Sequence, residues 1–366
     1  MKRNKKKSYR NLLIVVFSLL TIGLVMYFSA SFGLFAKDHH LFYISLIKHI
    51  GLGAIGGVLL MFLVSRYLPI SLLDKYAYVV YFLSLLVTGL VFIPGLGFSH
   101  GGASRWISFG FITFQPVEFL KVGALIALSH WLIRYGKSIR EWKGFVIYFL
   151  LLIPTAIVLL LQPDTSSTVL IFLIAWVLAF LRGAKFSHLI ISAFIAIFAL
   201  GGLIAYRPYI RERIDVYFHP EHDPLGAGYQ IRQSKVAIGS GEIIGRGIGK
   251  SGHKFGSYLP EASSDSIFAI YAEETGFVGS FLLIILYIAF LFFGIRIAKR
   301  AKHPFEQNLV VGLVLFIVIQ SLLNIATISG LIPLSGFPLI FMSGGGTALL
   351  ISLIEVGVIL AVARRI

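Results

Sequence analysis

Long apolar runs, separated by short polar and basic clusters, recur along the whole chain. Ten of these runs approach the roughly 20 residues that a helix needs to cross a bilayer. They cover residues 12–34, 45–64, 74–94, 115–133, 145–161, 166–181, 187–206, 275–295, 308–328 and 346–363. The pattern predicts an all-α integral membrane protein of about ten transmembrane helices, with both termini on one side.

Composition excludes a water-soluble protein and supports a single polytopic membrane domain over residues 1–366. The chain is 57% apolar and only 13% charged, and its mean hydropathy is +0.89. A net charge of +16 could suggest nucleic acid, but the basic residues fall in clusters between apolar runs, which indicates membrane topology instead. The absence of cysteine excludes disulfides, thiolate metal ligands and a cysteine nucleophile.

The distribution of basic residues predicts the orientation. Lys and Arg gather at both termini and in alternate connections, so the positive-inside rule places both termini in the cytoplasm. Residues 207–266 then form one large extracytoplasmic loop. Residues 207–274 hold nine of the sixteen acidic residues: Glu212, Asp215, Glu221, Asp223, Glu242, Glu261, Asp265, Glu273 and Glu274. We interpret this concentration of acidic residues as a functional site.

Charged residues at an apolar span are costly, and they usually face a cavity with a function. Glu118 and Lys121 follow Pro116 at the start of a predicted helix, and the spacing of three puts them on one face. They either form a structural ion pair or line a site in an outward cavity.

Three further polar positions lie at predicted outer ends of spans. Arg105 offers a guanidinium fork for phosphate or carboxylate, and its neighbour Trp106 could be an interfacial anchor. Asp164 ends the fifth span and could cap the next helix.

Asp265 lies where the polar loop meets the eighth apolar span. At a helix N-terminus it could be a general base or a plain N-cap, and the residue alone does not decide. His219, His222 and His253 lie in the outer region too, but their spacing matches no metal-site signature, and we interpret them as surface imidazoles.

Together these residues resemble the motifs of the shape, elongation, division and sporulation family, whose members include FtsW, RodA and SpoVE. Within it, residues 249–255 are more similar to the division member FtsW than to RodA. The matching segments are Arg105-Trp106-Ile107, Gln115-Pro116 with Glu118 and Lys121, Gln162-Pro163-Asp164, Gly226-Ala227-Gly228-Tyr229-Gln230, Leu259-Pro260-Glu261, Asp265, Glu273-Glu274, Asn324 and Ser343.

The resemblance implies an inverting glycosyltransferase with a fold similar to the GT-C membrane enzymes. It would polymerise the peptidoglycan precursor lipid II at the outer face of the bacterial cytoplasmic membrane, in septal division. Asp265 matches the family's essential acid and Glu118 with Lys121 its functional pair, so the resemblance implies that these three residues are catalytic. The expected substrate-binding residues are Arg105, Trp106, Asp164, Gln230, Lys254, Glu261 and Ser343.

The resemblance also implies a class B penicillin-binding protein and other division proteins as partners. A divalent cation, Mg²⁺ or Mn²⁺, is a hypothesis for offsetting pyrophosphate charge, although the sequence offers no definite ligand set. Three alternatives stay open: a polymerase of cell elongation similar to RodA, a lipid II flippase, and an inactive scaffold. The scaffold remains an alternative because residues beside Asp265, such as Ser266, differ from the family motif.

Overall fold

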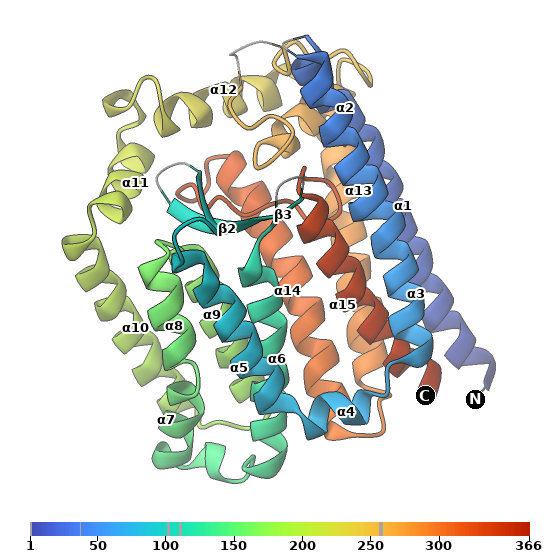
Figure 1. Ribbon diagram of the computed structural model, residues 1–366, viewed down its shortest axis with the longest axis vertical. Helices are drawn as coiled ribbons and strands as arrows, with labels where there is room; N and C mark the ends of the chain where they lie inside the picture. The colour runs from blue at the N-terminus through green and yellow to red at the C-terminus, as the bar shows by residue number, and fades with distance from the viewer. Residues whose placement is uncertain (1, 37, 101–102, 110–111, 256–258) are drawn as a thin grey trace.

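The computed structural model describes residues 2–36, 38–100, 103–109, 112–255 and 259–366, and most of them are helical (Figure 1). The longer helices are α1 (Lys2–Phe35), α3 (Gly57–Tyr67), α5 (Ala77–Gly89), α6 (Pro116–Arg134), α9 (Thr165–Leu181), α10 (Phe186–Tyr206), α11 (Pro208–Phe218), α12 (Ala227–Ser240), α13 (Ile267–Ala298), α14 (Pro304–Ile328) and α15 (Gly346–Arg365). The shorter ones are α2 (His39–Ile47), α4 (Ile70–Lys75), α7 (Trp142–Leu150), α8 (Ile153–Leu161), the π-helix η1 (Lys48–Gly56), and the 3₁₀ turns η2 (Leu90–Phe92), η3 (Ser138–Arg140) and η4 (Pro220–His222).

Apolar helices lie at all ten predicted spans. Within the described residues, eight helical segments are long and apolar enough to cross a membrane by length and composition. The remaining two predicted spans, 74–94 and 166–181, correspond to the shorter apolar helices Ala77–Phe92 and Thr165–Leu181. Both termini lie at the same end of the bundle (Figure 1), as an even number of spans requires.

Helices α6, α14 and α15 form the buried centre of the bundle. Most of their residues are buried, whereas α10 exposes nearly all of its apolar side chains. In Figure 1, α1, α3 and α13 lie on one side of this centre, and α5, α8, α9 and α10 on the other. A helix that is apolar all round and exposed outside the core is suited to a lipid environment.

A small three-stranded antiparallel sheet accompanies the helices, and the sequence did not predict it. Its strands β1 (Gly97–His100), β2 (Ala103–Phe109) and β3 (Ile112–Phe114) pair in the order β1-β2-β3. In the central strand β2, Ile107 pairs with Gly97 of β1 on one side and with Phe114 of β3 on the other. Strands this short give none of the long apolar runs on which the span prediction rested. The sheet lies towards the end of the bundle opposite the termini (Figure 1).

The long connection predicted over residues 207–266 lies at that same end. It contains α11, η4 and α12, followed by turns that lead into α13, and Figure 1 shows α12 near the end of α1, with α11 between α12 and α10. The connection is therefore structured and lies at the end of the bundle opposite the termini.

Helix α13 is broken at Gly276, where φ is 67° and ψ is −164°. The loop after α12 joins the two halves. The Phe277 amide donates to the Glu242 carbonyl at 2.9 Å, and the Val278 amide donates to the Ile243 carbonyl at 3.0 Å. The loop also donates to α13: the Arg246 amide donates to the Glu273 carbonyl at 2.9 Å, and the Gly247 amide donates to the Glu274 carbonyl at 3.0 Å. The loop thus satisfies backbone groups that the break would otherwise leave unpaired.

Replacing Gly276 by alanine should lower the melting temperature of the detergent-solubilised protein. This backbone conformation is essentially restricted to glycine and costs other residues about 1–3 kcal/mol. An added Cβ would also lie 2.3 Å from the Gly245 nitrogen and 2.6 Å from the Ile243 oxygen. Gly202→Ala in α10 is the control, because its Cβ meets nothing within 4 Å. Equal melting of the two variants would contradict the joining role of the loop.

Candidate functional site

Asp265 lies on a turn that three parts of the molecule hold in place just before α13. Asn324 of α14 donates through Nδ2 to the Asp265 carbonyl at 2.8 Å and to the Phe337 carbonyl at 2.6 Å. Gln230 of α12 donates to the hydroxyl of Ser266 at 2.9 Å. The position of the Asp265 turn is therefore set by α12, α14 and the connection that precedes α15.

The connection before α15 makes further contacts with the same turn. Ser343 donates its hydroxyl to the Ser264 carbonyl at 2.8 Å and accepts the Leu339 amide at 2.7 Å. The Gly344 amide donates to the Ser263 carbonyl at 2.7 Å. Gln230 and Ser343, both predicted to bind substrate, thus contact the turn that carries the acid.

The surroundings of Asp265 disfavour its ionised form. Burial raises the pKa of its carboxyl to about 6, and the nearby Glu261 carboxylate acts in the same direction. A hydrogen bond from the Ser264 hydroxyl and the positive charges of Arg213 and Arg105 oppose this rise. A carboxylate that titrates near neutrality is suited to exchange protons.

The structure separates the two acids that could have been helix caps. Asp164 is the N-cap of α9, and its carboxylate accepts the Ser167 amide at 3.1 Å. In α13 the N-cap position belongs to Ser266, and its side chain makes no capping hydrogen bond. The cap interpretation therefore fits Asp164 and does not describe Asp265.

Two arginines from different elements lie near this acid. Arg105 of β2 donates from Nε to the Gln162 carbonyl at 3.3 Å and from Nη2 to the Pro163 carbonyl. Arg213 of α11 donates from Nη1 to the Leu334 carbonyl at 3.3 Å. Arg105 thereby joins the sheet to the turn between α8 and α9, while Arg213 joins α11 to the connection before α15.

The charges of these arginines interact with each other and with two acids. Burial lowers the pKa of Arg213, and the positive charge of Arg105 lowers it further. The phenol of Tyr209 and the carboxylates of Asp164 and Asp265 act in the opposite direction and raise the pKa of Arg213. Two guanidinium groups and two carboxylates thus share one region at the end of the bundle opposite the termini.

Arg213 was not among the predicted site residues. The sequence Arg211-Glu212-Arg213 lies in a polar stretch and resembles no chemical motif. A signal exists in the helical periodicity, because Arg213 lies between Ile210 and Val216 on the wheel of α11, and both of these are buried. Trp106, which was predicted, lies half-buried on β2, opposite Phe98 in β1.

Glu118 and Lys121 form an ion pair inside the bundle. Their carboxylate and ammonium are 2.6 Å apart, and both side chains are buried. Lys121 also donates to Oε1 of Gln320 at 2.6 Å. Gln320 lies one turn before Asn324 on α14, so this ion pair and the Asp265 turn contact successive turns of the same helix.

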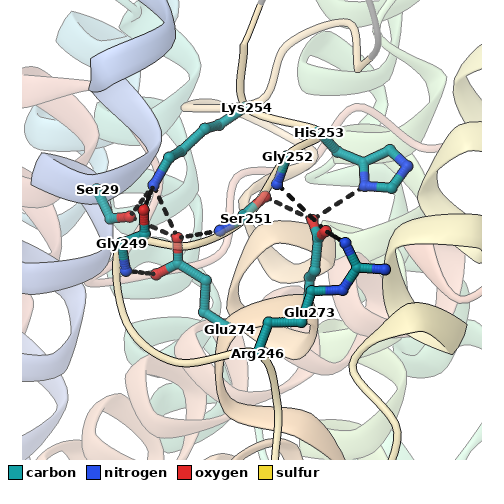
Figure 2. Close-up of polar contacts among 9 residues, drawn as sticks. All are labelled: Ser29, Arg246, Gly249, Ser251, Gly252, His253, Lys254, Glu273 and Glu274. Atoms are coloured by element: carbon teal, nitrogen blue, oxygen red, sulfur yellow. Dashed lines mark hydrogen bonds and ion pairs between the residues drawn. The ribbon is translucent and has the colours of Figure 1, made fainter.

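A second group of charges gathers around Glu273 and Glu274, the two acids shortly before the break in α13 (Figure 2). Glu274 accepts the Ser29 hydroxyl at 2.6 Å, the Lys254 ammonium at 3.1 Å and the Gly249 amide at 2.8 Å. Lys254 also donates to the Gly249 carbonyl at 2.6 Å and to Ser29 at 3.0 Å. Lys254 and Glu274 therefore fasten α1, the loop after α12 and α13 to one another.

The adjacent Glu273 has its own partners in the same loop (Figure 2). Its carboxylate lies 3.0 Å from Nδ1 of His253 and 3.3 Å from Nη1 of Arg246, and it accepts the hydroxyl of Ser251. The side chain is fully buried. His253, interpreted from the sequence as a surface imidazole, is a neighbour of this buried acid.

A cavity of about 640 Å³ lies between these charges and the Asp265 turn. Two of the predicted substrate-binding residues, Lys254 and Glu261, contribute to its wall. Its lining combines the C-terminal end of α1, residues at and just before the start of α12, the loop after α12 and the turn before α13: Ala30, Gly33, Leu34, Leu225, Tyr229, Lys254, Leu259, Pro260, Glu261, Ala262 and Ser263.

The fold and these residues define a polytopic membrane protein with an ionisable site at one end of its bundle. The family model for FtsW, RodA and SpoVE, described as "Cell cycle protein", matches residues 10–366. The chain therefore belongs to this family, as its motifs predicted.

Similar proteins cover nearly the whole chain. Stage V sporulation protein E of Bacillus subtilis is 36% identical over 98% of both chains. A probable peptidoglycan glycosyltransferase FtsW of Synechocystis sp. is 36% identical over 95% of this chain and 87% of that one.

Among solved structures, a peptidoglycan synthase complex described as coordinating polymerization and crosslinking contains a chain with TM-score 0.79 and 29% identity, over 97% of each chain. The rod shape determining protein RodA of Thermus thermophilus aligns with TM-score 0.68 and 26% identity, over 96% of this chain and 95% of RodA.

Lys254→Met should destabilise the protein, because Glu274 would remain buried without its cation. Removing one partner of a buried ion pair typically costs about 3–5 kcal/mol. The double variant Lys254→Met with Glu274→Gln should regain most of the lost melting temperature, since it leaves no unpaired charge. If Lys254 served only to contact substrate, the single variant would melt like the wild type.

Proposed function

We propose that this chain is a peptidoglycan glycosyltransferase that polymerises lipid II at the outer face of the bacterial cytoplasmic membrane. The observation that carries the proposal is the Asp265 carboxyl, which has a pKa of about 6 and lies within the influence of Arg105 and Arg213. Relatives named as probable peptidoglycan glycosyltransferases support the same reaction. In this orientation both termini are cytoplasmic, and α11 and α12 are outside.

The chemistry begins with proton transfer to Asp265. Its carboxylate accepts the proton of a sugar 4-hydroxyl, and that oxygen forms a bond to the anomeric carbon of a second lipid-linked disaccharide. The bond from this carbon to the pyrophosphate breaks, and undecaprenyl pyrophosphate leaves with the bonding electrons. Attack opposite to the leaving group inverts the anomeric configuration.

Cationic groups in the site bind the pyrophosphate. Guanidinium groups suit phosphate oxygens because they donate two parallel hydrogen bonds, so Arg105 and Arg213 take this role. Glu118 and Lys121 lie in the interior, and they act as positioning residues through Gln320 and the next turn of α14. In this proposal Asp164 holds α9 and thereby the turn that Arg105 contacts.

Mg²⁺ or Mn²⁺ fits the oxygen donors that are present. Asp265 and Glu261 interact electrostatically, and Mg²⁺ is commonly held by one or two carboxylates together with substrate phosphates. Glu261 would hold the ion together with the substrate phosphates, and Asp265 would stay available to accept the proton. Bound there, it would offset charge on the pyrophosphate.

A class B penicillin-binding protein is the partner that we propose. The solved complex with TM-score 0.79 coordinates polymerization with crosslinking, and crosslinking is transpeptidase chemistry. The relatives named FtsW favour a septal division complex with further division proteins. Co-purification in mild detergent would identify the partner.

Asp265→Asn should lower lipid II polymerisation by at least two orders of magnitude while leaving folding intact. Asn retains the shape of the side chain but cannot accept the proton, and general bases contribute about 10²–10⁴-fold. The measurement is glycan strand formation by the purified complex in vesicles. Glu212→Gln, which neutralises an exposed acid on α11, should retain activity.

Near-normal turnover by a well-folded Asp265→Asn variant would remove the base from the mechanism. The same vesicles distinguish the other functions. Lipid II translocation without glycan synthesis would identify a flippase, and partner binding without either activity would identify a scaffold.

Polymerisation should fall as the pH drops below about 6. Because the pKa of Asp265 is raised to about 6, its carboxyl is protonated at lower pH and cannot accept the hydroxyl proton. The expected acidic limb loses activity about tenfold per pH unit, and kcat/KM measured from pH 5 to 8 would record it. A limb centred near pH 4 would mean that the site does not shift this group.

A further inference from the structure

The corner between α11 and α12 brings together three side chains that can ligate metal. Each of His219, Glu221 and His222 offers one ligand atom, and these three atoms lie within 4.8 Å of one another. Among the described residues, this is the group of three or more histidines and acids that meets that spacing. All three side chains are exposed, so an ion could reach them from solvent.

The spacing of one pair of ligand atoms is close to what a bound ion requires. Nδ1 of His219 lies 3.4 Å from Oε1 of Glu221. Ligand atoms about 2.0–2.2 Å from a tetrahedral Zn²⁺ are separated by roughly 3.3–3.6 Å, so this pair is already at the required distance. The rings of His219 and His222 stack with centroids 4.9 Å apart and an interplanar angle of 21°, which keeps both imidazoles at the corner.

A fourth side chain supports one of the imidazoles. Oδ2 of Asp215, in the last turn of α11, lies 2.9 Å from Nδ1 of His222. This contact leaves Nε2 of His222 available as a ligand. A carboxylate that accepts the other ring N–H is the usual outer-shell partner of a metal-bound histidine, because it fixes the tautomer and the ring orientation.

The backbone at the corner is held on both sides. The His222 amide donates to the His219 carbonyl at 3.0 Å. The Asp223 carboxylate accepts the Gly226 amide at 2.9 Å and the next amide at 2.6 Å, which fixes the start of α12. The three candidate ligands therefore lie on a turn whose backbone is held by hydrogen bonds.

We propose that this corner binds one divalent transition-metal ion, with Zn²⁺ as the physiological ligand, through His219, Glu221 and His222. Two imidazoles and one carboxylate favour such an ion over Mg²⁺ or Ca²⁺, which prefer oxygen ligands throughout. Water occupies the remaining position. The site is separate from Asp265, and the proposal does not depend on the function proposed above.

Metal at this corner would stiffen two helices that reach the Asp265 region. Helix α11 carries Arg213, which contacts the connection before α15, and α12 carries Gln230, which contacts the Asp265 turn. An ion coordinated at their junction would fix the angle between α11 and α12. Its effect on the candidate site is therefore one of positioning.

The test is titration of the purified full-length protein, prepared without a histidine tag, with Zn²⁺ by calorimetry and with Co²⁺ by visible absorption. We expect one high-affinity ion per chain and a Co²⁺ spectrum with nitrogen ligation, reversed by EDTA. The variant His219→Ala with His222→Ala should bind Zn²⁺ at least tenfold more weakly. Glu221→Gln should weaken binding by a smaller factor.

The matched control is His39→Ala with His40→Ala, which removes two exposed imidazoles elsewhere and should bind Zn²⁺ like the wild type. Because all of these side chains are exposed, each variant should melt like the metal-free wild type, and melting curves would verify this. Equal Zn²⁺ affinity in the wild type and in His219→Ala with His222→Ala would overturn the site. So would loss of binding in the His39 and His40 control.

Discussion

The break in α13 imposes a requirement on which much of the end of the molecule opposite the termini depends. Backbone groups at a break in a helix must find partners elsewhere in the protein, because the helix no longer supplies them. The loop over residues 242–254 supplies them at Gly276, and it then reaches back so that Lys254 can pair with Glu274. Ser29 of α1 completes this contact, so the first helix is fastened to the eighth predicted span through a loop more than 200 residues away in sequence.

The same arrangement explains how Asp265 is positioned. Its turn connects directly to the first half of α13, which the loop anchors, and it is also held by Gln230, Asn324 and Ser343 from three other elements. Because α14 contacts the Glu118–Lys121 pair one turn deeper, a change in that interior pair would reach Asp265 through the backbone of a single helix. Rigid helices thus support an acid that itself lies on a turn.

The sequence predicted the family, the ten apolar segments and the acid at the end of the outer loop, because long apolar runs and dense motifs are local signals. The small sheet, the break at Gly276 and the role of Arg213 were not predicted. Each depends on contacts between distant segments: Gly276 looks like any glycine in an apolar helix until the loop at 242–247 is placed beside it. Lys254 was recognised as important, but only its distant partners Ser29 and Glu274 explain why it is buried.

The Glu274–Lys254 pair and Asp265 differ in how fully other groups satisfy their charges, and this difference bears on the proposed reaction. Glu274 and Lys254 pair with each other, and both also hydrogen-bond to Gly249, so their polar atoms are taken up in holding segments of the fold together. Asp265 has one hydroxyl donor at 3.3 Å, a neighbouring carboxylate, and two nearby arginines that donate hydrogen bonds to backbone carbonyls. A carboxyl with a raised pKa beside cations that it does not neutralise is prepared to accept a proton while those cations bind an anionic leaving group. The contrast therefore supports our proposal that Asp265 transfers the proton, while the Glu274 group anchors the fold.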